Sequence, residues 1–436
     1  MTWKGNDTME ILTLGLFCAG LILCIVLKFS ILYALGAGLV LFWMYGRHKG
    51  FSWKRLFVLS LEGIMTAKNI LLTFLLIGVM TALWRAAGTI PVIVSFASTL
   101  IRPSILVLMT FLLNCLVSML TGTSFGTAAT MGVICGAIGS SLGVDLRLVG
   151  GAVLSGAYFG DRCSPVSTSA LLVAELTNTV VFDNIPRMMK SALVPFLLSC
   201  AVYLGLGFAA APAGDVPDLT ALFGREFTLH WAAVLPAAVI LVLSILRVSV
   251  KPAMAASIAV SIPLCLLLQH RVPAELVQMA LTGFRAADPE VASMLNGGGI
   301  SSMLRSGGIV CISSSFSGIF RETGLLDGAK GAVEKLASRK GSYAAMLCTA
   351  AVSGIIACNQ TLTIMLTNQL CGSLMKDRHS FALGLADTAV VVAPLVPWSI
   401  AGSVPLASVG APLSGIWFAC YLYFLPVWRL LRMNTL

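Results

Sequence analysis

Residues 156–167 read Gly-Ala-Tyr-Phe-Gly-Asp-Arg-Cys-Ser-Pro-Val-Ser, which places a carboxylate, hydroxyls and a proline among small residues. The chain around this stretch is strongly apolar, as expected for a protein that lives in lipid. An ionisable side chain at membrane depth costs about 3 kcal/mol on insertion scales. Interrupted backbone is tolerated at that depth only where it lines a cavity. The stretch therefore indicates a path for an ion or a small solute.

The bulk composition predicts membrane residence. Of the 436 residues, 58% are hydrophobic and 11% are charged, whereas soluble domains carry about 25% charged residues. The length allows about a dozen spanning helices of about 20 residues each. We predict an all-α polytopic membrane protein that forms a single transporter unit over residues 1–436. We expect about 10–14 helical segments, with re-entrant or broken helices where apolar runs are too short to span.

Apolar runs bounded by charge give approximate spans. Three of them are Ile105–Leu120, Ser191–Ala211 and Phe381–Ile400. The segment Lys54–Lys68 mixes basic and acidic residues with Leu and Phe, which predicts an interfacial helix.

We interpret the net charge of +10 as setting the orientation of the chain in the membrane, and not as a sign of binding to nucleic acid. Basic residues lie in short loops, where they favour the cytoplasmic side. We predict a cell (inner) membrane location with both termini cytoplasmic, and the polar loop Pro212–His230 on the outer side. The three basic clusters are Arg47, His48, Lys49, Lys54 and Arg55, then Lys330, Lys335, Arg339 and Lys340, then Arg429 and Arg432.

Cysteine and histidine usage argues against a cofactor site and against an enzyme. Nearly all twelve cysteines lie in apolar runs, no two have C-x-x-C spacing, and the four histidines are scattered in loops. Buried free cysteine behaves as a small hydrophobe. We therefore expect no structural metal and no cofactor, and no Ser/His/Asp set of the hydrolase type.

The two halves of the chain carry similar interruptions. In the first half, Thr121–Thr127 reads Thr-Gly-Thr-Ser-Phe-Gly-Thr and is followed by Asp161; in the second, Asn359–Thr363 reads Asn-Gln-Thr-Leu-Thr and is followed by Asp387. Prolines lie just beyond each acidic residue. Paired interruptions of this kind are typical of transporters with inverted repeats. We predict that the repeat cores lie within residues 100–211 and 296–431.

Asp161 and Asp387 are the strongest candidates for ion handling. The alternative for Asp161 is a structural ion pair with Arg162, which requires broken backbone because adjacent helical residues diverge. The alternative for Asp387 is an interfacial carboxylate next to the loop that ends at His379.

Hydroxyl and amide groups around the interruptions are candidate oxygen ligands for a hard cation, although small residues also serve simple helix packing. Glu175 is either a second titratable site or the mark of a helix end. The candidate ion- or substrate-binding residues are Asp161, Asp387, Thr121, Thr123, Ser124, Thr127, Ser164, Asn359, Thr361, Thr363, Thr388 and Glu175.

These blocks resemble the NhaC-type sodium/proton antiporters of the ion transporter superfamily. The resemblance rests on Thr121–Thr127, on Gly156–Asp161 with Ser164-Pro165, and on Asp387 with the Pro-Leu-Val-Pro-Trp segment at 394–398. It implies secondary transport across a bacterial inner membrane by inverted repeats with membrane-embedded hairpins. It also implies a homodimer with a scaffold and a moving transport domain. The Na⁺ candidates that it indicates are Asp161, Ser164 and Asp387.

Two departures from the family pattern leave the cargo open. Thr168 stands where the family usually has an acidic residue, and Ala386 stands where it often has Glu. The resemblance implies a Na⁺/H⁺ antiporter, with Na⁺ and H⁺ as transported partners and Asp161 binding either. The alternative is an ion-coupled exchanger of an organic acid or amino acid, in which Arg162 clamps an anionic substrate.

Overall fold

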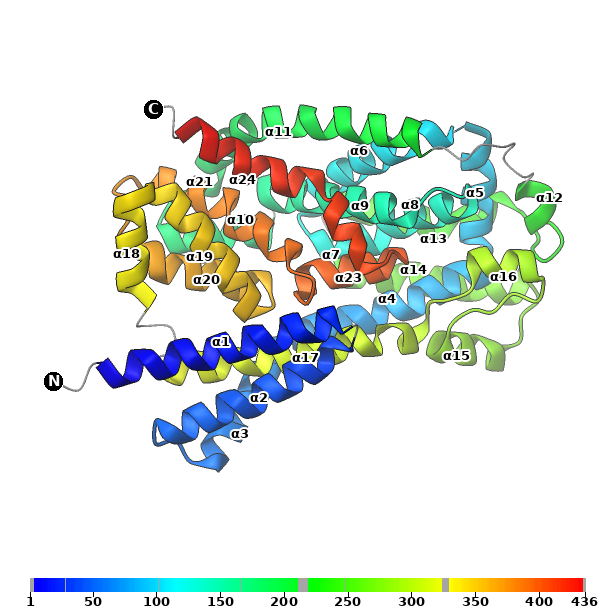
Figure 1. Ribbon diagram of the computed structural model, residues 1–436. Helices are drawn as coiled ribbons and strands as arrows, with labels where there is room; N and C mark the ends of the chain where they lie inside the picture. The colour runs from blue at the N-terminus through cyan, green and yellow to red at the C-terminus, as the bar shows by residue number, and fades with distance from the viewer. Residues whose placement is uncertain are drawn as a thin grey trace.

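The computed structural model describes residues 4–27, 29–100, 102–165, 167–210, 219–246, 248–323 and 329–433. Over these ranges the chain is built of helices, with one isolated antiparallel bridge between Phe284 and Gly297. The all-α prediction is confirmed. Figure 1 shows two layers, with the helices of residues 4–86 and 299–323 lying together beneath most of the other helices.

The first layer consists of long helices packed around α17, which contacts α2, α3, α4 and α15. Close approach of α3 and α17 depends on glycine, because a Cβ at Gly63 would meet the main chain of Ser314 and Ser315. The helix predicted at Lys54–Lys68 is present as α3, which packs on α17. Its position at the membrane interface stays a prediction. The helices of this layer are α1 (Lys4–Val26), α2 (Ile31–His48), α3 (Trp53–Thr66), α4 (Lys68–Ala86), α14 (Val250–Leu267), α15 (Pro273–Thr282) and α17 (Gly299–Thr323).

The second layer contains both interrupted regions. Its first part is α6 (Pro103–Thr121), α7 (Ser124–Thr127), the π-helical turn η1 (Ala128–Gly132), α8 (Val133–Ser141), α9 (Leu146–Cys163), α10 (Thr168–Thr177) and α11 (Val181–Ala209). Its second part is α19 (Ser342–Ala357), α20 (Gln360–Cys371), α21 (Arg378–Asp387), α22 (Ala389–Val392), η3 (Ala393–Leu395), α23 (Ile400–Val409), η4 (Leu413–Phe418) and α24 (Cys420–Met433). The connecting elements are α5 (Thr89–Leu100), α12 (Leu219–Phe223), η2 (Trp231–Val234), α13 (Leu235–Ile245), α16 (Pro289–Leu295) and α18 (Ala329–Lys340).

Length and apolar composition make this a multi-pass membrane protein. Among the described residues, four helices are long and apolar enough to span a bilayer: α6, α11, α14 and the Gly299–Phe320 part of α17. Two bent pairs raise the number to six if each is one span. They are Leu71–Ala86 with Thr89–Phe96, bent by 67°, and Arg378–Leu395 with Ile400–Val409, bent by 57°.

Helix α9 is held tightly against α6. Gly156 and Gly160 form a G-x-x-x-G pair, a spacing that lets two helix backbones approach closely. A Cβ at Gly156 would lie 2.7 Å from the carbonyl oxygen of Phe111 on α6. Only glycine fits there, so the end of α9, which carries Asp161, is fixed relative to α6.

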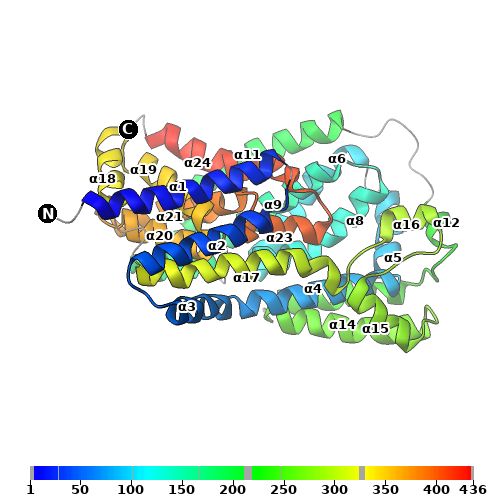
Figure 2. The same cartoon turned by 60° about the horizontal axis from the view of Figure 1, so that its bottom comes forward.

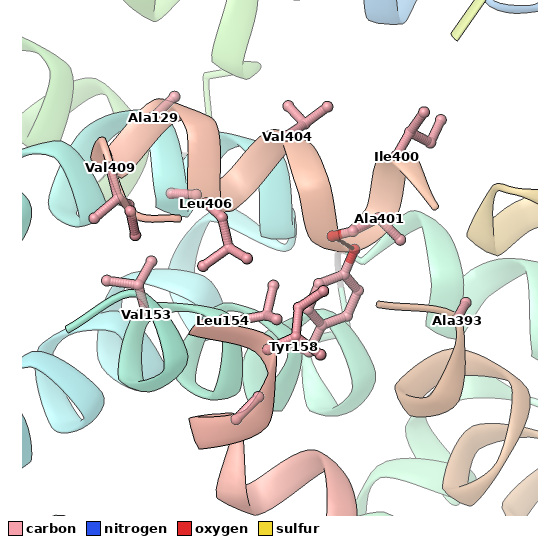
Figure 3. Packing of buried hydrophobic residues seen from close by; sticks show 14 of the residues in the cluster. Ala129, Val153, Leu154, Tyr158, Ala393, Ile400, Ala401, Val404, Leu406 and Val409 are labelled. Carbon is pink, nitrogen blue, oxygen red and sulfur yellow. Dashed lines mark hydrogen bonds between the residues drawn. The ribbon is translucent and has the colours of Figure 1, made fainter. Parts of the chain in front are cut away.

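The two parts of the second layer share one apolar core. Figure 3 shows Val153 and Leu154 of α9 facing Leu406 and Val409 of α23. Tyr158 is fully buried, and its hydroxyl donates a hydrogen bond of 2.8 Å to the carbonyl oxygen of Ala401. This hydrogen bond joins α9, which carries Asp161, to α23 in the second half of the chain.

Both termini lie at one end of the molecule. Figures 1 and 2 show the N-terminus, the C-terminus and α18 at the same end, and α12 and α16 at the opposite end. The turn between α2 and α3 also lies at the end with the termini. Arg47 and His48 are in the last turn of α2, next to this turn. Within the predicted outer loop, Asp215 and Asp218 lie outside the described residues.

Candidate functional site

The first interruption in each half has the same backbone geometry. Helix α6 is capped at its C-terminus by Gly122, in the left-handed region with φ 64°, and Thr123 follows in extended conformation with φ −147°. Helix α19 is capped by Cys358, also left-handed with φ 57°, and Asn359 follows with φ −148°. Thr123 and Asn359 then cap α7 and α20 with their side chains. Each half therefore stops one helix and starts a new one within two residues.

The second interruption is repeated as well. Ser167 caps α10 with φ −71° and ψ 133°, and Ser399 caps α23 with φ −71° and ψ 135°. Counted back from these caps, Asp161 and Ala393 both stand six residues upstream, whereas Asp387 corresponds to Ser155, twelve residues upstream. The two acidic residues are thus not counterparts, and one half alone carries a carboxylate at the interruption.

Asp161 is buried inside a small polar cage. The residue is 2% exposed. Its Oδ1 accepts a hydrogen bond of 3.0 Å from the hydroxyl of Ser167, and its Oδ2 lies 2.8 Å from Ser169 Oγ. The Oδ2 atom also accepts a 2.9 Å hydrogen bond from Nε2 of Gln360, 199 residues away in the sequence. The cage is built from both halves of the chain.

No ion pair neutralises Asp161 within the part of the chain that the structure describes. The ion pairs there join other carboxylates to Lys or Arg within 4.0 Å. Burying a charge without a charged partner is costly. A proton or a metal cation would remove that cost, so Asp161 has the electrostatic setting of an ion-exchanging carboxylate.

Asp387 has the opposite setting, because it lies between two guanidinium groups. Both Asp387 and Arg162 are 0% exposed, and Arg162 Nη2 pairs with Asp387 Oδ1. Nε of Arg429 lies 2.9 Å from Asp387 Oδ2, without the alignment of a hydrogen bond. Arg162 also donates to Ser191 Oγ at 2.6 Å and to the carbonyl oxygen of Met188 at 3.0 Å. We call Arg162, Asp387 and Arg429 the buried triad.

The hydroxyls of the first interruption stabilise the interruption itself. Thr121 and Thr127 share a hydrogen bond of 3.1 Å, and Thr127 also donates to the carbonyl oxygen of Thr123 at 2.9 Å. Ser124 is buried as the first residue of α7. The hydroxyl of Ser164 donates to the carbonyl oxygen of Met119 at 2.8 Å, which ties the end of α9 to α6.

The other candidates are spread over the second half and the surface. Asn359 donates to the carbonyl oxygen of Ala357, Thr363 to that of Asn359, and Thr388 to that of Gly384. Thr361 on α20 and Glu175 on α10 are exposed.

Sequence reasoning missed three partners of Asp161: Ser167, Ser169 and Gln360. Gln360 is the first residue of α20, beside the candidate Asn359, and its amide was the available signal. Its reach to Asp161 depends on how the two interrupted regions pack, which no local pattern reveals.

A cation here would be bound by one carboxylate and neutral oxygens. Among the described residues, no group of three or more His, Cys, Asp or Glu side chains is placed to hold a metal ion. Hydroxyl, amide and carbonyl oxygens are suitable ligands for hard cations.

Comparison with known proteins identifies the family. The model of the Na⁺/H⁺ antiporter family matches residues 7–175 and 156–430. The Na⁺/H⁺ antiporter NhaC of Bacillus subtilis is 28% identical over 87% of this chain and 86% of its own length. NhaC of Alkalihalophilus pseudofirmus is 25% identical over 99% of this chain and 96% of its own length. The malate-2H⁺/Na⁺-lactate antiporter of Bacillus subtilis is 28% identical over 87% of this chain and 85% of its own length. The chain belongs to the Na⁺/H⁺ antiporter family.

Proposed function

We propose that this protein exchanges Na⁺ for H⁺ across the membrane, with Asp161 binding either ion. The observation that carries the proposal is a buried carboxylate that has hydroxyl and amide partners but no cationic partner among the described residues. The family supports the same reading, since two relatives are named as Na⁺/H⁺ antiporters.

A single exchanging carboxylate couples the two ions by competition. When Na⁺ binds to Asp161 its proton leaves, and when a proton binds Na⁺ leaves. If the loaded site opens to each side in turn, a gradient of one ion drives the other. The fixed partners Ser167 and Ser169 orient the carboxylate on the first half, while Gln360 contacts it from the second half.

We assign the two acidic residues different roles. Asp161 exchanges ions, whereas Asp387 neutralises Arg162 and Arg429 and joins α9, α21 and α24. Ser164 and Thr123 support the exchange indirectly, by holding the interrupted backbone in place.

We further propose that residues 100–211 and 296–431 form two inverted repeats around the site. The matching left-handed stops and the matching serine caps support this reading. Ser155 on α9 lies 2.6 Å from the hydroxyl of Tyr203 on α11, and its counterpart Asp387 on α21 pairs with Arg429 on α24. Ser155 and Asp387, which hold equivalent positions, thus contact α11 and α24, the corresponding helices of the two repeats. The first contact joins two hydroxyl groups and the second is an ion pair.

The orientation that we propose has both termini in the cytoplasm, in the cell inner membrane. The basic turn between α2 and α3, the basic helix α18 and the C-terminal helix α24 all end on the same side as the termini (Figures 1 and 2). A bias of Lys and Arg to one side marks the cytoplasmic face. A reporter that works only in the cytoplasm should be active when it is fused to the C-terminus, and a reporter that works only outside the cytoplasm should be inactive there.

The alternative is exchange of an organic acid or amino acid, as the malate/lactate relative suggests by its name. That reading needs a guanidinium free to clamp a carboxylate. Arg162 is fully buried and already paired with Asp387, which favours an inorganic cation.

Proteoliposomes with an internal pH dye test the proposal. Addition of Na⁺ should move protons in the wild type, and Asp161→Asn should abolish the flux. Asp145→Asn is the matched control, because Asp145 caps the same helix at the protein surface and should leave the flux intact. Flux driven by malate, lactate or arginine but not by Na⁺ would select the alternative. Unchanged Na⁺ exchange in Asp161→Asn would remove Asp161 from the mechanism.

A further inference from the structure

The side-chain amide of Gln360 lies between the exchanging carboxylate and a main-chain carbonyl. Gln360 is buried as the first residue of α20. Its Nε2 donates to Asp161 Oδ2 at 2.9 Å and to the carbonyl oxygen of Val390, on α22, at 3.1 Å. One nitrogen therefore bridges two oxygens that belong to different halves of the chain.

The other end of the amide has a partner that suits either orientation. Gln360 Oε1 accepts a hydrogen bond of 3.1 Å from Ser169 Oγ, which also lies 2.8 Å from Asp161 Oδ2. A hydroxyl can donate or accept. If the amide turned by half a rotation, Ser169 Oγ would accept from Nε2, and its single proton would then be donated to Asp161 Oδ2. The rotation keeps the side chain in the same space, because the amide nitrogen and oxygen are nearly equal in size.

The rotation changes what the two bridged oxygens face. With Nε2 inward, the amide supplies hydrogen-bond donors to Asp161 Oδ2 and to Val390 O. With Oε1 inward, three oxygens converge: one carboxylate, one amide and one main-chain carbonyl. An amide nitrogen cannot bind a hard cation, whereas amide and carbonyl oxygens can.

We propose that Gln360 is a cation-selecting ligand of the Asp161 site that alternates between these two orientations. Its NH₂ group faces the carboxylate when no metal cation is bound, and its oxygen joins the carboxylate and Val390 O around Na⁺. This inference rests on the proposed Na⁺/H⁺ exchange at Asp161.

The asymmetry of the two halves supports a single such site. Ser124 holds the position of Gln360 in the first half, as the residue that follows the cap Thr123. The counterpart of Asp161 in the second half is Ala393. The pairing of a carboxylate with an amide thus occurs once, where α20 of the second half packs near α10 of the first.

Flux measurements on Gln360→Met and Gln360→Glu test the inference. Methionine keeps the length and removes both polar ends, so the half-saturating Na⁺ concentration should rise at least tenfold and the preference for Na⁺ over Li⁺ and K⁺ should weaken. Proton flux at saturating Na⁺ should fall much less. Gln360→Glu has oxygen at both ends, so it should lower the half-saturating Na⁺ concentration at alkaline pH.

The matched control is Gln369→Met, the same substitution at an exposed position of the same helix. It should leave both the Na⁺ dependence and the ion preference unchanged. Stabilisation by Na⁺ against thermal unfolding gives a second readout, which should disappear in Gln360→Met and persist in Gln369→Met. A purely structural role for Gln360 would lower the melting temperature without changing the ion preference.

The outcomes separate this inference from the proposed function. Wild-type protein without Na⁺-driven proton flux overturns both. Wild-type exchange that Asp161→Asn abolishes, with half-saturation and preference in Gln360→Met within twofold of the wild type, overturns the role of Gln360 alone. If Gln360→Met does not fold, an unaltered Na⁺ dependence in Gln360→Glu overturns it instead.

Discussion

Removing the central carboxylate of the buried triad should destabilise the protein more than removing one of its two arginines. Asp387→Asn keeps the shape of the side chain but leaves Arg162, at 0% exposure, and Arg429 without an anion. The 2.9 Å between Arg429 Nε and Asp387 Oδ2 corresponds to an attraction of about 6 kcal/mol between opposite charges at an effective dielectric constant of about 20. Desolvation offsets part of this, and breaking a buried pair costs about 3–5 kcal/mol. We expect a loss of stability in that range.

Arg162→Met should cost less, because Asp387 then keeps Arg429 as its partner. Ser191 Oγ still donates to the carbonyl oxygen of Met188 at 3.0 Å. The remaining loss is therefore that of the two hydrogen bonds that Arg162 donates to these groups, about 1–3 kcal/mol in all. Combining the two changes should restore part of the stability lost in Asp387→Asn, since one buried cation is then gone. Arg162→Met would thus lower the stability of the wild type but raise that of Asp387→Asn, a reversal that is expected for a pair of opposite charges.

Thermal unfolding in detergent with a thiol-reactive dye measures these differences, because six of the cysteines are buried in the folded protein. The double variant should melt above Asp387→Asn. The reasoning fails if the double variant is as unstable as the two single losses added together, or if Arg162→Met is the more damaging single change.

Three further outcomes follow from single contacts. Gly156→Ala should separate α9 from α6, because the new methyl group would lie 2.7 Å from the carbonyl oxygen of Phe111. The stability of the folded protein should fall by about 1–3 kcal/mol in the same melting assay. An unchanged melting temperature would contradict this packing. Hydrogen bonds from the Arg147 side chain hold the pKa of Asp145 below its usual range, so stability from this group is present above the unfolded pKa of about 3.9 and is lost as pH falls further. Asp145→Asn should therefore flatten the decline of the melting temperature between about pH 5 and pH 3, and an equally steep decline refutes the assignment. Tyr158→Phe should cost about 1 kcal/mol through the lost hydrogen bond to α23, with faster hydrogen exchange at the start of α23; exchange at the wild-type rate argues against that link.

Several features of the fold could be predicted from local sequence, and others could not. The apolar run Ile105–Leu120 became α6, Pro103–Thr121, with little change. Helix α11 begins at Val181, ten residues before the predicted start at Ser191, because its first turns carry polar residues such as Asp183 and Asn184. The predicted span Phe381–Ile400 is broken before α23, where Val396 and Ser399 leave the helix. Apolar runs locate lipid contact, whereas helix ends depend on caps.

The chain by itself determined membrane residence, the helical class, the two interruptions and the acidic residue Asp161, because composition, glycine and capping residues act through local physics. The tertiary structure alone decided that Arg162 pairs with Asp387 rather than with its neighbour, and that Gln360 reaches Asp161 across 199 residues. Adjacent residues on a helix diverge by about 100°. The partner of a buried charge is therefore set by which helix packs against its face, and that packing depends on the whole chain.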